Sequence, residues 1–281
     1  MSQTFTIVGL PDTQKYTKEE NGGTKEMFYS QTQWISNNTN TENIVFVSHF
    51  GDITDDGDLA AESQWIYADN AMSTLDNVVP YAVLPGNHDK FGGTTKYNQY
   101  FGVDRFSGYV YYGGNYQGNE NNYCLFSAGG MEFILISLEY WPLSDTRDWA
   151  SSVLNTYSNR RAIITTHSLL NTDGTWTDNQ HGGGENVYNM AKTHSNVFLM
   201  LCGHNHGEYV RSDTYDGNTI YTVLADYQDY TNGGNGYLRI MEFDPINDQI
   251  NFKTYSPYIN QWMTGNSSQF SIPYDMDYTS P

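Results

Sequence analysis

Positive charge is scarce in this sequence. It contains 13 Lys and Arg residues against 32 Asp and Glu residues, which gives a formal net charge of −19 at pH 7. Binding to a nucleic-acid backbone requires clustered Lys and Arg side chains, so this balance argues against a nucleic-acid partner. An anionic substrate would need another source of attraction, and bound metal ions can provide it.

Cysteines and long apolar segments are also lacking. Cys124 and Cys202 are the only cysteines, which argues against a disulfide framework and against a zinc site rich in cysteine. No apolar run approaches the roughly 20 residues that a membrane-spanning helix needs. The sequence therefore predicts no transmembrane segment.

The composition bears on where the protein works. Met1-Ser2-Gln3 leads straight into an apolar segment, with no recognisable signal peptide. However, the chain is rich in Tyr, Asn, Thr and Gly and poor in Lys and Arg, a composition common in exported bacterial proteins. We therefore expect a secreted or periplasmic bacterial protein, and a cytoplasmic location is the alternative.

The length of the chain, 281 residues, is enough for one large domain or two small ones. The polar clusters described below extend from Asp12 to His206, so any internal division would separate them. We therefore predict a single domain over residues 1–281, in which residues 257–281 form a polar tail on the surface.

The first part of the chain alternates between apolar strands and amphipathic helices. Strands are predicted at residues 5–10, 43–48 and 81–84, and helices at 25–37 and 59–75. This β-α-β-α-β order implies parallel strands joined by right-handed crossovers. The loops that follow the strands should therefore lie along one edge of the sheet.

The rest of the chain is less regular. Residues 101–122, rich in Tyr, Gly and Asn, are predicted as a long loop or small hairpin beside the site. Further on, the pattern predicts strands at 123–127, 131–137, 161–166 and 196–202 and helices at 145–157 and 185–193. From residue 208 it predicts strands separated by turns, at 209–212, 219–224, 236–243 and 249–255. We expect these last strands to be antiparallel and to complete a second sheet.

Polar clusters follow several of these strands. They are Asp12-Thr13-Gln14, Gly51-Asp52, Gly86-Asn87-His88-Asp89, a lone His167 and Gly203-His204-Asn205-His206. Taken singly, Asp12 and Gln14 could cap a helix and Asp52 could be a turn residue. If residues 204–206 are extended, as we expect, His204 and His206 should point the same way, a spacing more typical of ligands than of core residues. Together these carboxylates, carboxamides and imidazoles suit a pair of divalent cations, and paired cations suit phosphoryl chemistry.

The order of the clusters resembles that of the calcineurin-like metallophosphoesterase superfamily. Its motifs occur in the order Asp-x-His, Gly-Asp, Gly-Asn-His-(Asp/Glu), an isolated His and Gly-His-x-His, and this chain matches them from about Phe5 to at least Tyr209. The resemblance implies an α/β fold, a four-layer α/β/β/α sandwich of two mixed sheets flanked by helices. The metal site would lie at the C-terminal edge of the strands.

The resemblance also implies two metal sites. One metal would be held by Asp12, Gln14, Asp52 and His206, and the other by Asp52, Asn87, His167 and His204, so that Asp52 bridges them. The chain departs from the family at Gln14, where most members have His. A carboxamide oxygen is a harder and weaker ligand than an imidazole nitrogen, so we expect the first site to favour Mn, Mg or Ca over tightly held Fe. The two ions could be Mn, Fe, Zn, Mg or Ca.

The resemblance further implies a mechanism, in which a metal-bridging hydroxide attacks the phosphorus of a phosphomonoester or phosphodiester. His88 would protonate the leaving oxygen or stabilise its developing charge, and Asp89 would orient the imidazole of His88. Asp55 could hydrogen-bond a residue of the site without binding metal itself, but a position in a solvated turn explains it better.

Two functions are compatible with the sequence. The first is a hydrolase that acts on a small phosphorylated substrate. The second is a secreted protein that binds a glycan or another ligand on a degenerate metallophosphatase scaffold, through loops rich in Tyr, Asn and Gly. Every ligand position is retained except for the change at Gln14, and this favours the hydrolase. The substrate and the oligomeric state do not follow from the sequence.

Overall fold

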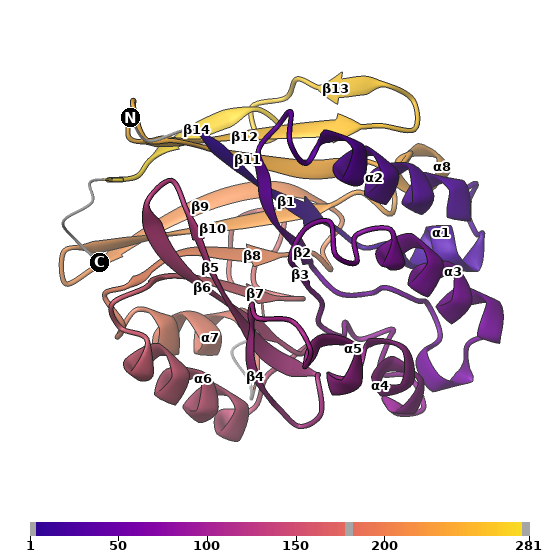
Figure 1. The fold of residues 1–281 in the computed structure, drawn as a ribbon, viewed down its shortest axis with the longest axis horizontal. Helices are drawn as coiled ribbons and strands as arrows, with labels where there is room; N and C mark the ends of the chain where they lie inside the picture. The colour runs from indigo at the N-terminus through magenta and orange to yellow at the C-terminus, as the bar shows by residue number, and fades with distance from the viewer. Residues whose placement is uncertain (1–3, 178–181, 277–281) are drawn as a thin grey trace.

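Two β-sheets pack face to face, and helices cover their outer faces (Figure 1). The structure is a computed structural model that describes residues 4–177 and 182–276. The predicted α/β/β/α sandwich with two mixed sheets is confirmed, because each sheet contains both parallel and antiparallel strands.

The first sheet contains seven strands. They are β1 (Phe5–Leu10), β2 (Ile44–His49), β3 (Tyr81–Ala82), β11 (Leu238–Asp244), β12 (Gln249–Ser256), β13 (Gln261–Met263) and β14 (Phe270–Pro273). Their order is β13-β12-β11-β1-β2-β3, and β14 also pairs with β12. The strands β1, β2 and β3 are parallel, as the β-α-β-α-β pattern predicts, whereas β11 runs antiparallel to β1.

The second sheet also contains seven strands. They are β4 (Tyr112–Tyr116), β5 (Asn121–Ala128), β6 (Met131–Leu138), β7 (Arg161–Thr166), β8 (Val197–Cys202), β9 (Gly207–Tyr215) and β10 (Asn218–Asp226). Their order is β4-β5-β6-β7-β8-β10-β9. The central strands β6, β7, β8 and β10 are parallel, so the loops after them open on one edge.

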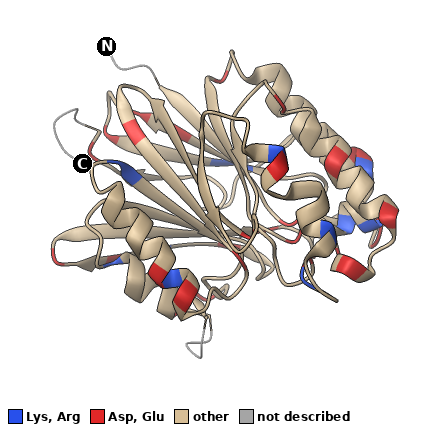
Figure 2. Ribbon diagram, turned by 60° about the horizontal axis from the view of Figure 1, so that its bottom comes forward, with Lys and Arg blue, Asp and Glu red and all other residues tan. Residues whose placement is uncertain are grey.

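The helices are α1 (Gln14–Lys18), α2 (Lys25–Asn38), α3 (Glu62–Ser73), α4 (Thr95–Phe101), α5 (Val103–Phe106), α6 (Ser144–Thr156), α7 (Gly184–Ala191) and α8 (Thr231–Gly234), with a 3₁₀ turn at Gly57–Leu59. The helices α2 and α3 pack on the first sheet, and α6 and α7 pack on the second. Charged residues lie mostly on the helices and loops rather than on the strands (Figure 2). Within residues 4–177 and 182–276, no helix combines the length and the apolar character needed to cross a bilayer.

Alternation of side chains along the strands produces three apolar layers. In β1, Phe5 and Ile7 belong to the layer between the sheets, whereas Val8 and Leu10 pack with the helices of the first sheet. The rings of Phe5 and Phe133, from opposite sheets, have centroids 5.7 Å apart. Both faces of the central strands are thus buried, which explains why they appear in the sequence as continuous apolar runs.

The C-terminal strands depart from the prediction. The sequence predicts that they complete one sheet together, but β9 and β10 join the second sheet while β11 and β12 join the first beside β1. The predicted surface tail from residue 257 is also wrong in part, because it adds β13 and β14 to the first sheet. The side chains of Ile272 and Met276 are buried, and this apolar contact holds the segment on the sheet.

The segment 101–122 forms more structure than a loop. It contains the end of α4, all of α5 and the strand β4, which pairs with β5 as a hairpin. The short helices α1 and α4 are not predicted from the sequence. Helices of five to seven residues carry too few turns to show a clear periodicity, and tertiary contacts stabilise them instead.

Candidate metal centre

The predicted ligands lie in loops that follow five strands. Asp12 and Gln14 follow β1, Asp52 follows β2, Asn87 follows β3, His167 follows β7, and His204 and His206 follow β8. These loops come from the C-terminal ends of parallel strands in both sheets. The predicted position of the site, at the C-terminal edge of the strands, therefore agrees with the topology.

Four of these side chains lie in close contact. The possible ligand atoms of Asp52, His167 and His204 all lie within 4.8 Å of one another. The His167 Nε2 atom is 3.2 Å from Asp52 Oδ2 and 3.8 Å from Asp12 Oδ2. The backbone N–H of His204 is 3.3 Å from both carboxylate oxygens of Asp12. The structure thus brings together residues that are up to 192 positions apart in the chain.

Glycines in the polar clusters make this close approach feasible. A Cβ added at Gly86 would lie 2.1 Å from Asp52 Oδ1, and one added at Gly203 would lie 2.1 Å from Asp12 Oδ1. Asp52 and His204 themselves have φ values of +51° and +70°, in the left-handed region. Such backbone costs about 1–3 kcal/mol per residue and is concentrated at functional sites.

Unpartnered acceptor atoms provide a test of whether this set fits metal ions. Among the described residues, the buried side-chain atoms without a hydrogen-bond partner include Gln14 Oε1, Asp52 Oδ2, Asn87 Oδ1 and His167 Nε2. Each unsatisfied buried polar group costs about 1–3 kcal/mol. Four such atoms in one predicted ligand set, with oxygen and imidazole donors combined, fit the coordination of divalent cations.

Hydrogen bonds fix which ring nitrogen each histidine presents. The His167 Nδ1–H donates to the carbonyl of Phe50 at 2.8 Å, so a neutral ring has its lone pair on Nε2. His206 pairs through Nδ1 with the carboxylate of Asp229, and its Nε2 lies 3.9 Å from Asp226 Oδ2. His206 is 41% exposed, so it lies at the rim of the centre, whereas His167 is fully buried.

Gln14 is oriented by a chain of hydrogen bonds. Its Nε2 amide donates to Gln228 Oε1. Gln228 in turn donates its own Nε2 to Asp226 Oδ2 at 3.0 Å and its backbone N–H to Asp226 Oδ1 at 2.9 Å. Because an ionised carboxylate only accepts hydrogen bonds, this order requires that Gln14 present its oxygen as the free acceptor. Gln228 carries no sequence signal that would have identified it.

The charges in the centre shift the pKa values of its members. Burial, together with Asp226, raises the pKa of Asp12 well above its usual value. Burial by itself would also raise the pKa of Asp52, but the charge of His167 lowers it. Burial lowers the pKa of His167, but Asp52 and Asp12 outweigh it and raise that pKa to about 10.

His204 shifts in the opposite direction to His167. Burial, followed by the charge of His167, lowers the pKa of His204 to about 4. At neutral pH, His204 is therefore unprotonated, whereas His167 holds a proton on the side of Asp52 and Asp12. A metal ion would compete with that proton for His167 Nε2, so metal binding should release it.

His88 is held by Asp55 rather than by Asp89. The His88 Nδ1 atom lies 2.7 Å from Asp55 Oδ1 and 2.7 Å from the Asp55 carbonyl oxygen. Burial lowers the pKa of His88, but the hydrogen bond to Asp55 and the charge of Asp52 raise it above the usual value. The backbone N–H of His88 donates to Asp52 Oδ1 at 2.9 Å, which joins this pair to the ligand set.

Asp89 has a different role from the predicted one. Its carboxylate accepts hydrogen bonds from the backbone N–H groups of Ile53, Thr54 and Gly86 and from the Thr54 hydroxyl. It therefore fastens the loop of Asp52 to the loop of Asn87. Burial, together with the charge of Asp52, raises the pKa of Asp89 to about 7.

The structure thus corrects two predictions about acidic residues. Asp89 does not orient the ring of His88, and Asp55 does not lie in a solvated turn, because its side chain is only 4% exposed. The sequence signal that could have identified Asp55 is its position three residues after Asp52 in the same loop.

His49, on β2, is a core residue that hydrogen-bonds Thr13 Oγ1 and the Gly51 N–H.

Comparison with known proteins identifies relatives of the chain. Residues 5–208 match the family model described as calcineurin-like phosphoesterase. The protein YvnB of Bacillus subtilis, named as uncharacterized, is 36% identical over 290 residues. That match covers 97% of this chain but 22% of YvnB, so the chain spans about a fifth of the length of this relative.

Solved structures show the same fold at low identity. A dimetal phosphatase from Danio rerio has a TM-score of 0.64 and 14% identity, with 96% of this chain and 99% of that chain covered. GAP50, described as the anchor in the inner membrane complex of Plasmodium, has a TM-score of 0.57 and 12% identity, with coverage of 98% and 89%. The family model covers all the loops that supply the clustered acids, amides and imidazoles, and the chain belongs to the calcineurin-like phosphoesterase family.

Proposed function

We propose that this protein hydrolyses a phosphomonoester or phosphodiester with the help of two divalent cations. The observation that carries the proposal is the set of buried, unpartnered acceptor atoms on Gln14, Asp52, Asn87 and His167, next to the His88–Asp55 pair. Apolar packing does not explain such a set. Gln14 Oε1 and Asn87 Oδ1 have lost their hydration without gaining a hydrogen bond, and Asp52 Oδ2 and His167 Nε2 face each other at 3.2 Å.

We divide the proposed ligands into two groups, one for each ion. We assign Asp12, Gln14, Asp52 and His206 to one ion, and Asp52, Asn87, His167 and His204 to the other. When bound, the two ions supply a water molecule of lowered pKa and enough positive charge to attract and polarise a phosphate group. This local charge offsets the overall charge of −19, which would otherwise repel an anionic substrate.

His88 is the proton donor in this proposal. Its ring contacts Asp55 through Nδ1, so Nε2 is the nitrogen that can face the substrate. Asp55 and Asp52 raise its pKa, and its protonated form can donate a proton to the oxygen that leaves the phosphorus. Asp55 positions the ring and stabilises the imidazolium.

The remaining assignments are proposals of the same kind. We infer that the chain forms one domain over residues 1–281, because both sheets contribute ligands to one centre. A small substrate is favoured over a nucleic acid, because 13 Lys and Arg residues cannot form an extended basic face against 32 acids. Export from the cell, favoured by the composition, is also a proposal.

An assay with two chromogenic substrates tests the function. The metal-loaded protein should hydrolyse p-nitrophenyl phosphate or bis-p-nitrophenyl phosphate in the presence of Mn²⁺, and a chelator should abolish the reaction. The ratio between the two rates would separate a monoesterase from a diesterase. If neither ester is hydrolysed with Mn, Fe, Zn, Mg or Ca, the binding role on a degenerate scaffold becomes the better interpretation.

A further inference from the structure

A pocket of about 370 Å³ is lined in part by Tyr140, whose ring contacts those of His167 and His204. Its lining includes Lys90, Glu139, Tyr140, Trp141, Leu143 and Asp145. Lys90 follows His88 by two residues, and the backbone N–H of Tyr140 donates to the carbonyl of Pro85 at 2.9 Å. The pocket is thus bounded by the loop that carries Asn87 and His88 and by the segment that follows β6.

One wall of the pocket is aromatic and reaches the metal ligands. The ring of Tyr140 has its centroid 5.2 Å from that of His204 and 5.8 Å from that of His167. The same ring stacks on Trp141, with centroids 5.5 Å apart and planes inclined by 16°. A group held in the pocket against Tyr140 would therefore lie on the ring that contacts both histidines.

The backbone at Trp141 is held in an unfavourable conformation. Its φ value is +55°, in the left-handed region that a bulky residue rarely occupies. A Cβ added at Gly182 would lie 2.6 Å from the carbonyl carbon and oxygen of Trp141, so only glycine fits behind this turn. Strain of this kind persists where the surroundings enforce it, and it is concentrated in ligand-binding sites.

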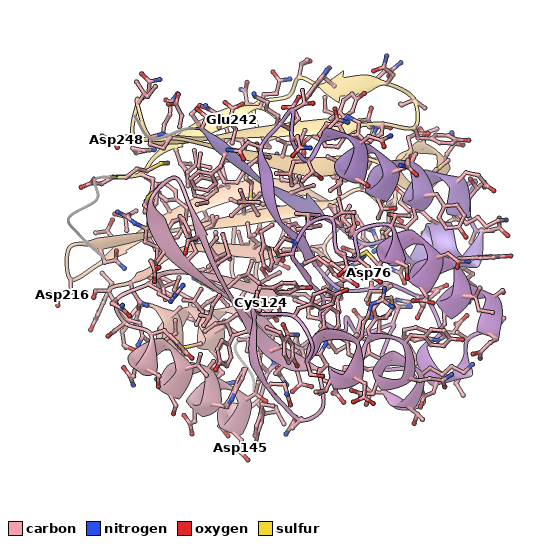
Figure 3. All side chains as sticks on the ribbon, viewed as in Figure 1. Asp76, Cys124, Asp145, Asp216, Glu242 and Asp248 are labelled. Atoms are coloured by element: carbon pink, nitrogen blue, oxygen red, sulfur yellow. The ribbon has the colours of Figure 1, made fainter. Side chains whose placement is uncertain are left out.

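The charge of the pocket disfavours a second anion. The Lys90 ammonium pairs with the Glu139 carboxylate, which also accepts hydrogen bonds from Asn121 and Thr146. Lys90 is therefore neutralised, and Asp145, which points outward at the start of α6, adds one negative charge (Figure 3). A negatively charged substituent would be repelled there, whereas an uncharged ring would not.

We propose that this pocket binds the leaving group of the phosphoester and selects an uncharged, planar ring. The inference rests on the proposed hydrolase function, which it extends to a substrate class. The volume is at the small end of the range of about 300–1,000 Å³ for ligand pockets, which suits a single ring system. An aromatic ring that stacks on Tyr or Trp gains binding energy beyond that of its buried area.

The chemistry of the step is that of hydrolysis. The oxygen of a water molecule forms a bond to phosphorus while the bond from phosphorus to the ester oxygen breaks. The ester oxygen takes a proton from His88 and departs as an alcohol that carries the ring. The attacking water gives up one proton to solvent, and His88 regains one from solvent. The pocket contributes binding and orientation of the departing alcohol, not a chemical group.

A pair of substrates with similar leaving groups tests the proposal. Benzyl phosphate and cyclohexylmethyl phosphate both release an alkyl alcohol, and they differ mainly in whether the ring is planar. The metal-loaded protein should show a kcat/KM about fivefold higher for benzyl phosphate, on the scale of an aromatic stacking contact. Equal hydrolysis of the two esters would overturn the pocket assignment and leave the hydrolase proposal intact.

Substitutions of Trp141 test whether this residue causes the preference for benzyl phosphate. Trp141→Gly removes the ring at a backbone conformation that glycine adopts readily, so it should abolish the benzyl preference without disturbing the loop. Trp141→Phe keeps a ring and should retain part of the preference. Trp262→Ala is the matched control, because Trp262 is 49% exposed and lies on β13 at the far edge of the first sheet. A preference that survives in Trp141→Gly would contradict the proposal.

Binding of phosphonates tests the pocket separately from the proposed hydrolase function. Benzylphosphonate and cyclohexylmethylphosphonate lack the ester oxygen, so their dissociation constants for the Mn²⁺-loaded protein can be measured without turnover. About fivefold tighter binding of the benzyl compound, lost in Trp141→Gly, supports the pocket even if no ester is hydrolysed. A 4-carboxybenzyl phosphonate should bind more weakly than the benzyl compound, and tighter binding of this charged ring would contradict the proposed selectivity.

Discussion

The two halves of the metal centre differ in what holds their ligands in place. The inner half, defined by Asn87, His167 and His204, is built on loops that bond directly to one another. The outer half, defined by Gln14 and His206, depends on side chains from the segment 226–229. Asp52 and Asp12 lie between the halves and are both buried.

In the proposed assignment, this difference indicates how the centre accommodates a carboxamide at Gln14. The inner half is supported by Asp89, which receives three of its hydrogen bonds from backbone N–H groups and so needs few particular side chains. In the outer half, the carboxamide of Gln14 has two distinct ends and requires a partner that selects between them. Gln228 and Asp226 provide that selection, so the support of the outer half is specific to the ligand.

The substitution Asp52→Asn should affect both halves equally and weaken metal binding in each. Asp52 is the residue that we assign to both ions and supplies the charge that would bridge them, so its loss should release both metals and reduce turnover to background. Metal content after gel filtration, measured by mass spectrometry, checks this outcome. Retention of two equivalents of metal would show that Asp52 does not bridge.

The substitution His88→Ala should leave both metal ions bound and reduce the rate of hydrolysis. General acid catalysis contributes about 10²–10⁴-fold in rate, so kcat should fall within that range while metal content stays constant. Phe91→Ala is a suitable control, because Phe91 packs near His88, with ring centroids 5.6 Å apart, and is 52% exposed. An unchanged kcat in His88→Ala would exclude His88 from the mechanism.

The substitution Gln228→Leu should weaken the outer half alone. Residues that orient a metal ligand typically contribute 10–100-fold to metal affinity, and here the first ion should be lost while the second stays. Stepwise titration of the metal-free protein with Mn²⁺, followed by electron paramagnetic resonance, distinguishes the two sites. Gln31→Leu is the matched control, because Gln31 is also buried but bonds the carbonyl of Tyr237.

The substitution Asp55→Asn should shift the pH profile of hydrolysis. The pKa of His88 is raised, so its acid form is present below that pKa and is lost as the pH rises through it. Removal of the Asp55 charge should lower this pKa, and the basic limb of kcat/KM should move to lower pH. The neighbouring Asp56→Asn, at a side chain that is 44% exposed, should leave the limb in place.

Mild dialysis of the unmodified protein should have the smallest effect. The carboxamide of Gln14 and the exposed ring of His206 make the outer ion the more weakly held. About one equivalent of metal should be lost, and added Mn²⁺ should restore it. Two equivalents of Fe that resist dialysis would contradict the expected preference of the first site.

Much of the fold follows from local pattern. The alternation of apolar strands and amphipathic helices before residue 90 predicts three parallel strands, and the structure contains them in that arrangement. The partners of the C-terminal strands are not local information, because β10 and β11 are neighbours in the chain yet join different sheets. Either sheet edge offers a strand the same backbone hydrogen bonds, so packing of distant side chains decides between them.

The sequence alone determined the family and the identities of the candidate ligands, because each cluster is short and directly follows an apolar strand. It could not distinguish the roles of Asp55 and Asp89, which depend on the direction in which each carboxylate turns after a tight loop. It also could not reveal Gln228, which meets Gln14 across 214 positions of the chain. Only the tertiary structure decides such contacts, because a hydrogen bond depends on distance and angle in space rather than on separation in sequence.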